Sequence, residues 1–392
     1  MSIHHKPEKQ RNPKRFYTMT LLLYAPIFFV LALIHARWYG WLAAGISFVL
    51  LLWMRSTKLW RGMWVPICFV MAFAVALGGL YVGRPEKEIS LMGQIGREGI
   101  RFFVRLPVEE EVRSGQVLAE VDIWRAPEAY DFYEVTLSQS KMEILRLREN
   151  PSPYVVLQLH GGAFEMGVVD AYRAVALRYS EILRGATVAT LDYRLWPEHG
   201  YPAQQDDTRE AWRYLTETLG YAPEQIIVAG DSAGGNLALF LSLWLRDQGE
   251  AMPGALVCMS PWADLSNSGP SHVENATVDP TLGVMAEDYD GHPVGVFSTY
   301  GDGLDVQAPY VSPSFGDYRG FPRMLLQVSS NELLLSDSEM VAANAIAHGV
   351  DCTLTVYDNL FHVFQLSLDL VPESRAAWQE IEAFLEDFLA GK

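Results

Sequence analysis

The residues Ile226-Ile227-Val228-Ala229-Gly230-Asp231-Ser232-Ala233-Gly234-Gly235 decide the fold of this chain. The β-branched and small apolar run 226–229 predicts a buried strand, and the sequence from Ser232 onward predicts a helix. Small residues flank Ser232 because so sharp a turn forces the serine backbone into a sparsely allowed conformation and projects its hydroxyl outward. A Gly-x-Ser-x-Gly pattern is common by chance, but directly after a buried strand it indicates a reactive serine.

Outward from this turn, short β-branched runs alternate with amphipathic helical stretches from residue 154 onward. This alternation predicts an α/β fold, a mostly parallel sheet with helices on both faces. The turn-rich segment 264–310 interrupts the alternation. We expect it to be a lid, because insertions at the carboxyl edge of such a sheet usually cover a ligand crevice. The predicted strands are 154–159, 186–191, 226–229, 255–259, 323–328 and 352–357.

A serine hydroxyl is a poor nucleophile at neutral pH and needs a base, which in turn needs an orienting carboxylate. His362 lies just beyond the last predicted strand, where a loop can bring its imidazole over the sheet edge. Glu332 follows the strand 323–328, within reach of the Nδ1 proton of His362. Asp337 is the rival acid, although it more naturally caps the helix that follows. We predict Ser232, His362 and Glu332 as the catalytic residues.

Acyl transfer also needs hydrogen-bond donors aimed at the developing oxyanion, each worth about 3 kcal/mol of barrier. The run His160–Phe164 (His-Gly-Gly-Ala-Phe) follows the strand 154–159, and its scarcity of side chains lets backbone amides approach a substrate carbonyl. The amide of the residue after the serine completes such a site. We predict an oxyanion hole formed by Gly161, Gly162, Ala163 and Ala233.

These motifs resemble those of the hormone-sensitive lipase family of α/β-hydrolases, in order and at family-like spacing over residues 140–390. The resemblance implies an α/β-hydrolase fold and carboxylic ester hydrolysis, with Ser232 as nucleophile, His362 as base and Glu332 as acid. The motifs that carry it are His160–Phe164, Asp192–His199, Gly230–Asn236, Ser260–Leu265 and the His362 loop.

The resemblance further implies that the amides of Gly162, Ala163 and Ala233 form the oxyanion hole, while Gly161 supports the turn. Two departures from the family pattern affect the site. The family's third glycine is Ala163, which keeps the amide but restricts φ. The common Asp-Pro-Leu is replaced by Glu332–Leu334, preceded by Ser329 where a glycine is usual.

The composition divides the chain into two unlike parts. Half of the 392 residues are apolar and 20% are charged, which excludes a disordered chain and a coiled coil. The net charge is −17, yet residues 1–83 contain nine Lys or Arg and one acid. The acidic remainder repels phosphate backbones, so we expect no nucleic-acid partner. The three cysteines are too few and scattered for a disulfide scaffold or a four-ligand zinc site, and the predicted chemistry requires no metal or organic cofactor.

Residues 1–83 are predicted to be a membrane anchor. Apolar blocks at 17–36, 38–54 and 62–83 approach the roughly 20 residues that a helix needs to cross a bilayer. Basic residues in the first 15 positions and in the loop 55–61 place both in the cytoplasm. Three spans then put the acidic domain outside the cytoplasm, whereas two keep it inside. We expect an integral, multi-pass protein in the lipid bilayer, with an extracytoplasmic catalytic domain.

Residues 84–150 are predicted to be a linker or cap with the first strands, and residues 151–392 the catalytic α/β-hydrolase domain. The sequence thus predicts a membrane-anchored serine hydrolase that cleaves esters with apolar acyl or lipid-like groups through an acyl-enzyme. One alternative is a non-catalytic ligand-binding receptor of the same fold, against which the presence of all three triad residue types speaks. A second is an amidase or deacetylase with the same triad. The sequence predicts no oligomeric state.

Overall fold

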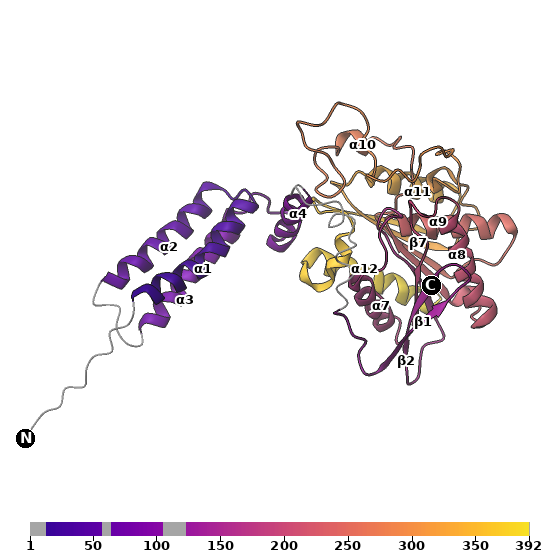
Figure 1. Ribbon diagram of the computed structural model, residues 1–392, viewed down its shortest axis with the longest axis horizontal. Helices are drawn as coiled ribbons and strands as arrows, with labels where there is room; N and C mark the ends of the chain where they lie inside the picture. The colour runs from indigo at the N-terminus through magenta and orange to yellow at the C-terminus, as the bar shows by residue number, and fades with distance from the viewer. Residues whose placement is uncertain (1–12, 57–63, 105–122, 392) are drawn as a thin grey trace, which may run out of the picture. The chain divides into compact units, whose positions relative to one another are not determined.

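The computed structural model describes residues 13–56, 64–104 and 123–391 (Figure 1). The chain divides into two compact units, Met1–Gly99 and Ile100–Lys392. The helices are α1 (Pro13–Leu33), α2 (Trp38–Ser56), α3 (Trp64–Gly83), α4 (Leu91–Val104), α7 (Asp170–Ile182), α8 (Ala203–Arg213), α9 (Ala233–Gln248), α10 (Ser271–Glu274), α11 (Leu335–Ala347) and α12 (Pro372–Leu389). The strands are β1 (Tyr130–Thr136), β2 (Lys141–Leu147), β3 (Val155–Leu159), β4 (Thr187–Asp192), β5 (Ile226–Asp231), β6 (Ala255–Met259), β7 (Arg323–Ser329) and β8 (Cys352–Tyr357).

In the first unit, α1, α2 and α3 pack around a small apolar cluster. Its buried members include Leu31 from α1, Leu51 from α2 and Ala76 from α3. Helices α2 and α3 approach closely at glycines, since a side chain on Gly83 would lie 2.7 Å from the Cα of Gly40. The predicted apolar blocks therefore correspond to helices with a shared core.

Within the described ranges, none of the helices combines the length and the apolar character needed to cross a membrane. The predicted integral, multi-pass location is therefore wrong, and the predicted two or three spans and the extracytoplasmic side are not supported. The prediction was based on the length of apolar blocks in the sequence, which does not measure whether each helix that forms is apolar enough along its whole length. The basic residues of positions 1–12 and most of the loop 55–61 lie outside the described residues.

The second unit is built on an eight-stranded sheet of order β1-β2-β4-β3-β5-β6-β7-β8. Strands β1, β2 and β4 pair antiparallel, and every pair from β4 to β8 is parallel. The chain passes from β3 to β4 on one side and later returns to β5 on the other, so the strand order reverses at β3. Loops that leave the carboxyl ends on the two sides of such a point enclose a crevice.

Helices cover both faces of this sheet, as the sequence predicts (Figure 1). Helices α8, α9 and α11 contribute to the larger core cluster on one face, and α7 and α12 contribute to the cluster on the other. The central strands β3, β5 and β6 are buried along their whole length, which explains their continuous apolar sequences. The predicted α/β fold is thus confirmed.

Candidate active site

The turn between β5 and α9 has the geometry that the sequence predicts. Ser232 adopts φ 52° and ψ −120°, a conformation that L-residues rarely occupy. The glycines around it allow close backbone contacts. A side chain on Gly230 or Gly234 would collide with the carbonyl group of Gly234 or Leu159, respectively, and one on Gly235 would lie 2.8 Å from Pro261.

Ser232 is fixed through its backbone and leaves its hydroxyl unengaged. Its amide donates to the carbonyl of Met259 at 3.0 Å, and its carbonyl accepts the amide of Trp262 at 2.9 Å. The residue is 5% exposed, and its hydroxyl makes no hydrogen bond to the part of the chain that is described. Catalytic hydrogen bonds are often formed only once substrate is bound.

The structure brings His362 and Glu332 together. His362 Nδ1 lies 2.6 Å from Glu332 Oε2, and Glu332 is fully buried. The second oxygen of Glu332 accepts the Ser260 hydroxyl at 2.8 Å and the Ser329 amide at 2.6 Å. Burial lowers the pKa of His362, but the hydrogen bond and charge of Glu332 outweigh it and raise the pKa above 6.5. Burial raises the pKa of Glu332, and His362 opposes that rise.

The parallel sheet explains why these residues meet. Loops after β5, β7 and β8 supply Ser232, Glu332 and His362 at the same edge, because carboxyl ends of parallel strands align. Ser329 and Ser330, at the end of β7, connect the loop of Glu332 to the loop of His362 by hydrogen bonds. Ser329 Oγ accepts the amide of Leu360 at 2.8 Å, which gives a structural role to the serine that replaces the usual glycine.

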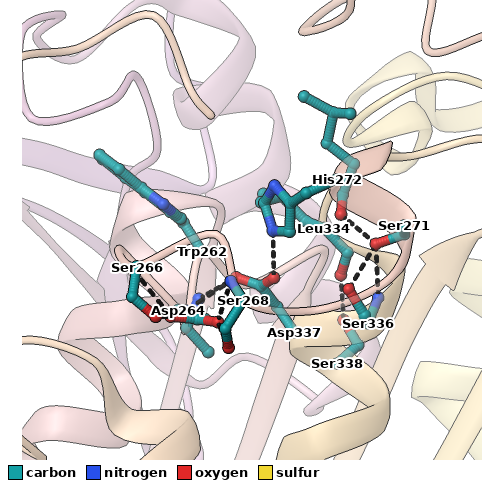
Figure 2. Close-up of polar contacts among 12 residues, drawn as sticks. Trp262, Asp264, Ser266, Ser268, Ser271, His272, Leu334, Ser336, Asp337 and Ser338 are labelled. Atoms are coloured by element: carbon teal, nitrogen blue, oxygen red, sulfur yellow. Dashed lines mark hydrogen bonds and ion pairs between the residues drawn. The ribbon is translucent and has the colours of Figure 1, made fainter. Parts of the chain in front are cut away.

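Asp337, the rival acid, has a different partner (Figure 2). Its carboxylate lies 2.9 Å from His272 Nε2 and accepts the amides of Ala263 and Asp264 at 2.9 and 2.8 Å. It does not cap α11, whose N-cap is Leu334 and lacks a side-chain cap bond. The position of Asp337 therefore favours Glu332 as the acid next to His362.

The loop after β3 lies against the serine turn, because Leu159 pairs with Gly230 in neighbouring strands. The Gly161 amide is already engaged, donating to Tyr172 Oη at 2.9 Å and to Asp231 Oδ1 at 3.2 Å. A side chain at Gly161 would lie 3.0 Å from the Ser232 Cβ. Gly161 is thus placed to support the loop rather than to donate to a substrate.

The amides of Gly162, Ala163 and Ala233 donate to no other group in the described chain. Gly162 has φ 108°, and both Ala163 (φ 56°) and Phe164 (φ 65°) lie in the left-handed region. The alanine that departs from the family pattern is therefore accommodated with backbone strain. The loop offers free amides next to the serine turn.

Two buried ionisable groups support this region. Burial raises the pKa of Asp231 to about 6, and its carboxylate accepts the Tyr172 hydroxyl at 3.0 Å. Burial lowers the pKa of His160 to about 4, so its imidazole is neutral at pH 7. His160 stacks on Tyr193 with ring centroids 4.0 Å apart. Among the described residues, no group of three or more His, Cys, Asp or Glu is arranged to hold a metal ion.

Sequence reasoning missed the residues whose hydroxyls bind the two buried carboxylates of the site, Glu332 and Asp231. Ser260 was quoted only as part of a family motif, and its contact with Glu332 joins segments 72 positions apart. Tyr172 lies on α7 in an ordinary helical pattern, and nothing in its local sequence indicates that its hydroxyl meets Asp231. Only the three-dimensional arrangement reveals these partners.

Comparison with known proteins agrees with this geometry. The α/β-hydrolase-fold family matches residues 156–366. An acetyl-hydrolase of Streptomyces hygroscopicus is 35% identical over 235 residues, covering 59% of this chain and 74% of the relative. An esterase of Acinetobacter venetianus is 34% identical over 230 residues, with coverage of 59% and 74%. The crystal structure of an esterase from the bacterial hormone-sensitive lipase family has a TM-score of 0.65 and 32% identity, covering 76% of this chain and 97% of that chain.

The chain therefore belongs to the α/β-hydrolases, and its similarity to hormone-sensitive-lipase-type esterases confirms the resemblance read from its motifs. Within that fold it is an ester-hydrolysing enzyme of the carboxylesterase or lipase-like type. The predicted enzyme class is thus confirmed.

Proposed function

We propose that the enzyme cleaves small-molecule carboxylic esters through an acyl-enzyme on Ser232, with His362 as the base and Glu332 as the acid of the triad. The observation that carries the proposal is the 2.6 Å contact between His362 Nδ1 and the buried Glu332, at the sheet edge that also presents Ser232. In this contact the Nδ1–H donates to the carboxylate, which leaves Nε2 as the proton acceptor.

In the first step, His362 Nε2 takes the Ser232 proton as Oγ forms a bond to the ester carbonyl carbon. The tetrahedral oxyanion is held by the amides of Gly162, Ala163 and Ala233. The intermediate collapses as the C–O bond breaks and the imidazolium gives its proton to the leaving alkoxide. Water then attacks the acyl carbon while His362 Nε2 takes one of its protons, and His362 gives that proton to Ser232 Oγ as the C–Oγ bond breaks and the acid product leaves.

We propose an apolar acyl group as the preferred substrate feature. Phe164, in the amide-bearing loop, has its ring centroid 4.1 Å from that of Tyr300 and 5.8 Å from that of Trp262. Trp262 also contacts the Ser232 backbone through its amide. All three rings are buried in the core, so the amide-bearing loop rests on an apolar base directly behind the reacting carbonyl. The lid role of residues 264–310 remains a prediction.

The test is a series of p-nitrophenyl esters of increasing acyl length, with Ser232→Ala as the matched inactive variant. We expect hydrolysis by the wild type and a higher kcat/KM for butyrate or longer chains than for a charged acyl group such as succinate. Equal or better hydrolysis of the charged ester would contradict the apolar preference. The p-nitroanilide analogues address the amidase alternative, and faster cleavage of the anilides would favour it.

A further inference from the structure

The acid loop after β7 is held by a segment that the sequence presents only as part of a lid. We propose that Asn275 and Asp279 are positioning residues, which fix the backbone on both sides of the Glu332 side chain and surround the His362–Glu332 pair with negative charge. This inference rests on the proposed function and deepens it. Both residues lie in the segment 271–283, which includes α10.

Asn275 holds the backbone of the acid loop by two hydrogen bonds. Its side-chain amide Nδ2 donates to the carbonyl of Ser330 at 2.9 Å and to the carbonyl of Glu332 at 2.8 Å. One side chain thus binds two carbonyls of the turn, and the Glu332 carbonyl also accepts the amide of Leu335 at 3.3 Å. Because the Glu332 carbonyl is restrained, the direction in which its side chain leaves the loop is restrained too.

Asp279, four positions after Asn275, holds the same loop. Its Oδ2 accepts the amide of Leu333 at 2.8 Å, and its Oδ1 accepts the amides of Thr281 and Leu282 at 2.8 and 2.9 Å. The residue is 4% exposed, so its carboxylate is held in place by three amides with little water. Asn275 therefore donates a hydrogen bond to the oxygen of the peptide unit between Glu332 and Leu333, and Asp279 accepts one from its nitrogen.

Asp279 also adds charge to the site. The charged groups that face His362 are Glu332 from the loop after β7, Asp279 from the segment 271–283 and Asp231 from the serine turn, and each raises the pKa of the imidazole. Three carboxylates from separate elements thus favour the imidazolium that forms when Ser232 gives up its proton. The segment 271–283 thus contributes in two ways: its hydrogen bonds position Glu332, and the charge of Asp279 stabilises the imidazolium of His362. Different substitutions test the two contributions.

Two variants separate them, with p-nitrophenyl butyrate as the probe. Asn275→Ala removes two hydrogen bonds but no charge. We expect kcat to fall about tenfold at nearly constant KM, because the acid is less well placed in the transition state, and the acidic limb of kcat/KM to stay where it is. Asp279→Asn keeps the size of the side chain but removes the charge. We expect a similar loss of kcat and, in addition, an acidic limb at lower pH, because the pKa of His362 falls.

Asp302→Asn is the matched control, since Asp302 is an exposed acid of the same insertion whose side chain makes no hydrogen bond or ion pair with the described residues. It should behave as the wild type in both measurements. If Asp279→Asn does not fold, Asn275→Ala still tests the proposal through kcat against KM. A folded Asn275→Ala with wild-type kcat, or a folded Asp279→Asn with an unmoved acidic limb, would overturn the inference while leaving the proposed function intact. A wild type that hydrolyses no ester would overturn the proposed function, and the inference with it.

Discussion

Two buried histidine–carboxylate pairs occur among the residues that the structure describes, His362–Glu332 and His272–Asp337, with N–O distances of 2.6 and 2.9 Å. Their carboxylates come from the same segment after β7, five positions apart in sequence. In both pairs the carboxylate side chain is fully buried. In both, burial lowers the pKa of the histidine, and the bond to the carboxylate outweighs it and raises the pKa.

The pairs differ in what the second ring nitrogen does. His272 Nδ1 lies 2.7 Å from the carbonyl of Val294, so both of its nitrogens are engaged within the fold. His362 Nε2 has no hydrogen-bond partner among the described residues. A histidine with both nitrogens engaged links structural elements, whereas one with a free nitrogen can exchange a proton. A carboxylate partner alone therefore does not identify a catalytic histidine; the second ring nitrogen must also be free.

The largest expected effect separates the pairs by activity. His362→Ala removes the proposed base, and we expect kcat for p-nitrophenyl butyrate to fall on the order of 10⁶-fold. His272→Gln keeps much of the side-chain volume and should leave kcat of the folded protein within about tenfold of the wild type, because both ring nitrogens of His272 are bound within the fold. Steady-state kinetics of the two variants measures the difference. Comparable losses of kcat in both variants would abolish the distinction.

The second effect separates the pairs by stability. Asp337→Ala leaves His272 buried without its carboxylate, and it leaves the buried amides of residues 263 and 264 without a hydrogen-bond acceptor. We expect the free energy of unfolding to fall by about 3–5 kcal/mol. Urea unfolding followed by tryptophan fluorescence measures this, with the exposed Asp302→Ala as control. A loss below about 1 kcal/mol would show that the His272 pair contributes little to the fold.

A smaller loss of kcat is expected on removing the hydroxyl of Ser260, which binds the Glu332 oxygen that does not contact His362. Ser260→Ala removes the hydroxyl that donates to Glu332 Oε1 at 2.8 Å. A hydrogen bond to a charged group contributes about 1.5–3 kcal/mol, so we expect kcat to fall at least about tenfold. The hydroxyl of Ser268, which donates to Asp264 at 2.6 Å in the cluster around the other pair, provides the control. Ser268→Ala should leave kcat unchanged, and an equal loss in both variants would argue against a specific role for Ser260.

The smallest effect is a shift in pH dependence. His362 must be neutral to accept the Ser232 proton, and its pKa is raised above 6.5, mainly by Glu332. Activity should therefore be lost as the pH falls through this raised pKa. Glu332→Gln removes the charge, so the acidic limb of its remaining activity should move to lower pH. An acidic limb at the same pH in the wild type and in Glu332→Gln would contradict the assignment of Glu332 as the partner of His362.

The sequence predicted those parts of the fold that depend on short stretches of residues, such as buried strands and the serine turn. The strands 255–259 and 352–357 have the predicted bounds, because uniform apolar or β-branched runs between turns leave little choice. The serine turn was predicted from its glycines, each of which the structure places against another backbone or ring. In contrast, β1 and β2 were not located. β1 is the edge strand and is largely exposed, and Lys141, Glu143 and Arg146 interrupt the apolar residues of β2, which weakens the apolar signal of both strands.

Long-range contacts were beyond sequence reasoning. The role of His272 could not be predicted, since nothing near it in the sequence indicates that Asp337, 65 positions away, binds its imidazole. The contacts of Asn275 and Asp279 with the acid loop join residues 57 and 54 positions apart. The N-terminal blocks misled the prediction for the opposite reason, because a strong local apolar signal was taken to define a membrane location.

The central claim is that Ser232 is the nucleophile activated by His362. A fluorophosphonate probe tests it most directly, because the probe bonds only to a serine whose proton a neighbouring base can accept. Mass spectrometry of the labelled protein should find the adduct on the peptide that contains Ser232, with labelling abolished in Ser232→Ala and strongly slowed in His362→Ala but not in His272→Gln. Absence of an adduct on the folded wild type, or an adduct that persists in Ser232→Ala, would contradict the account.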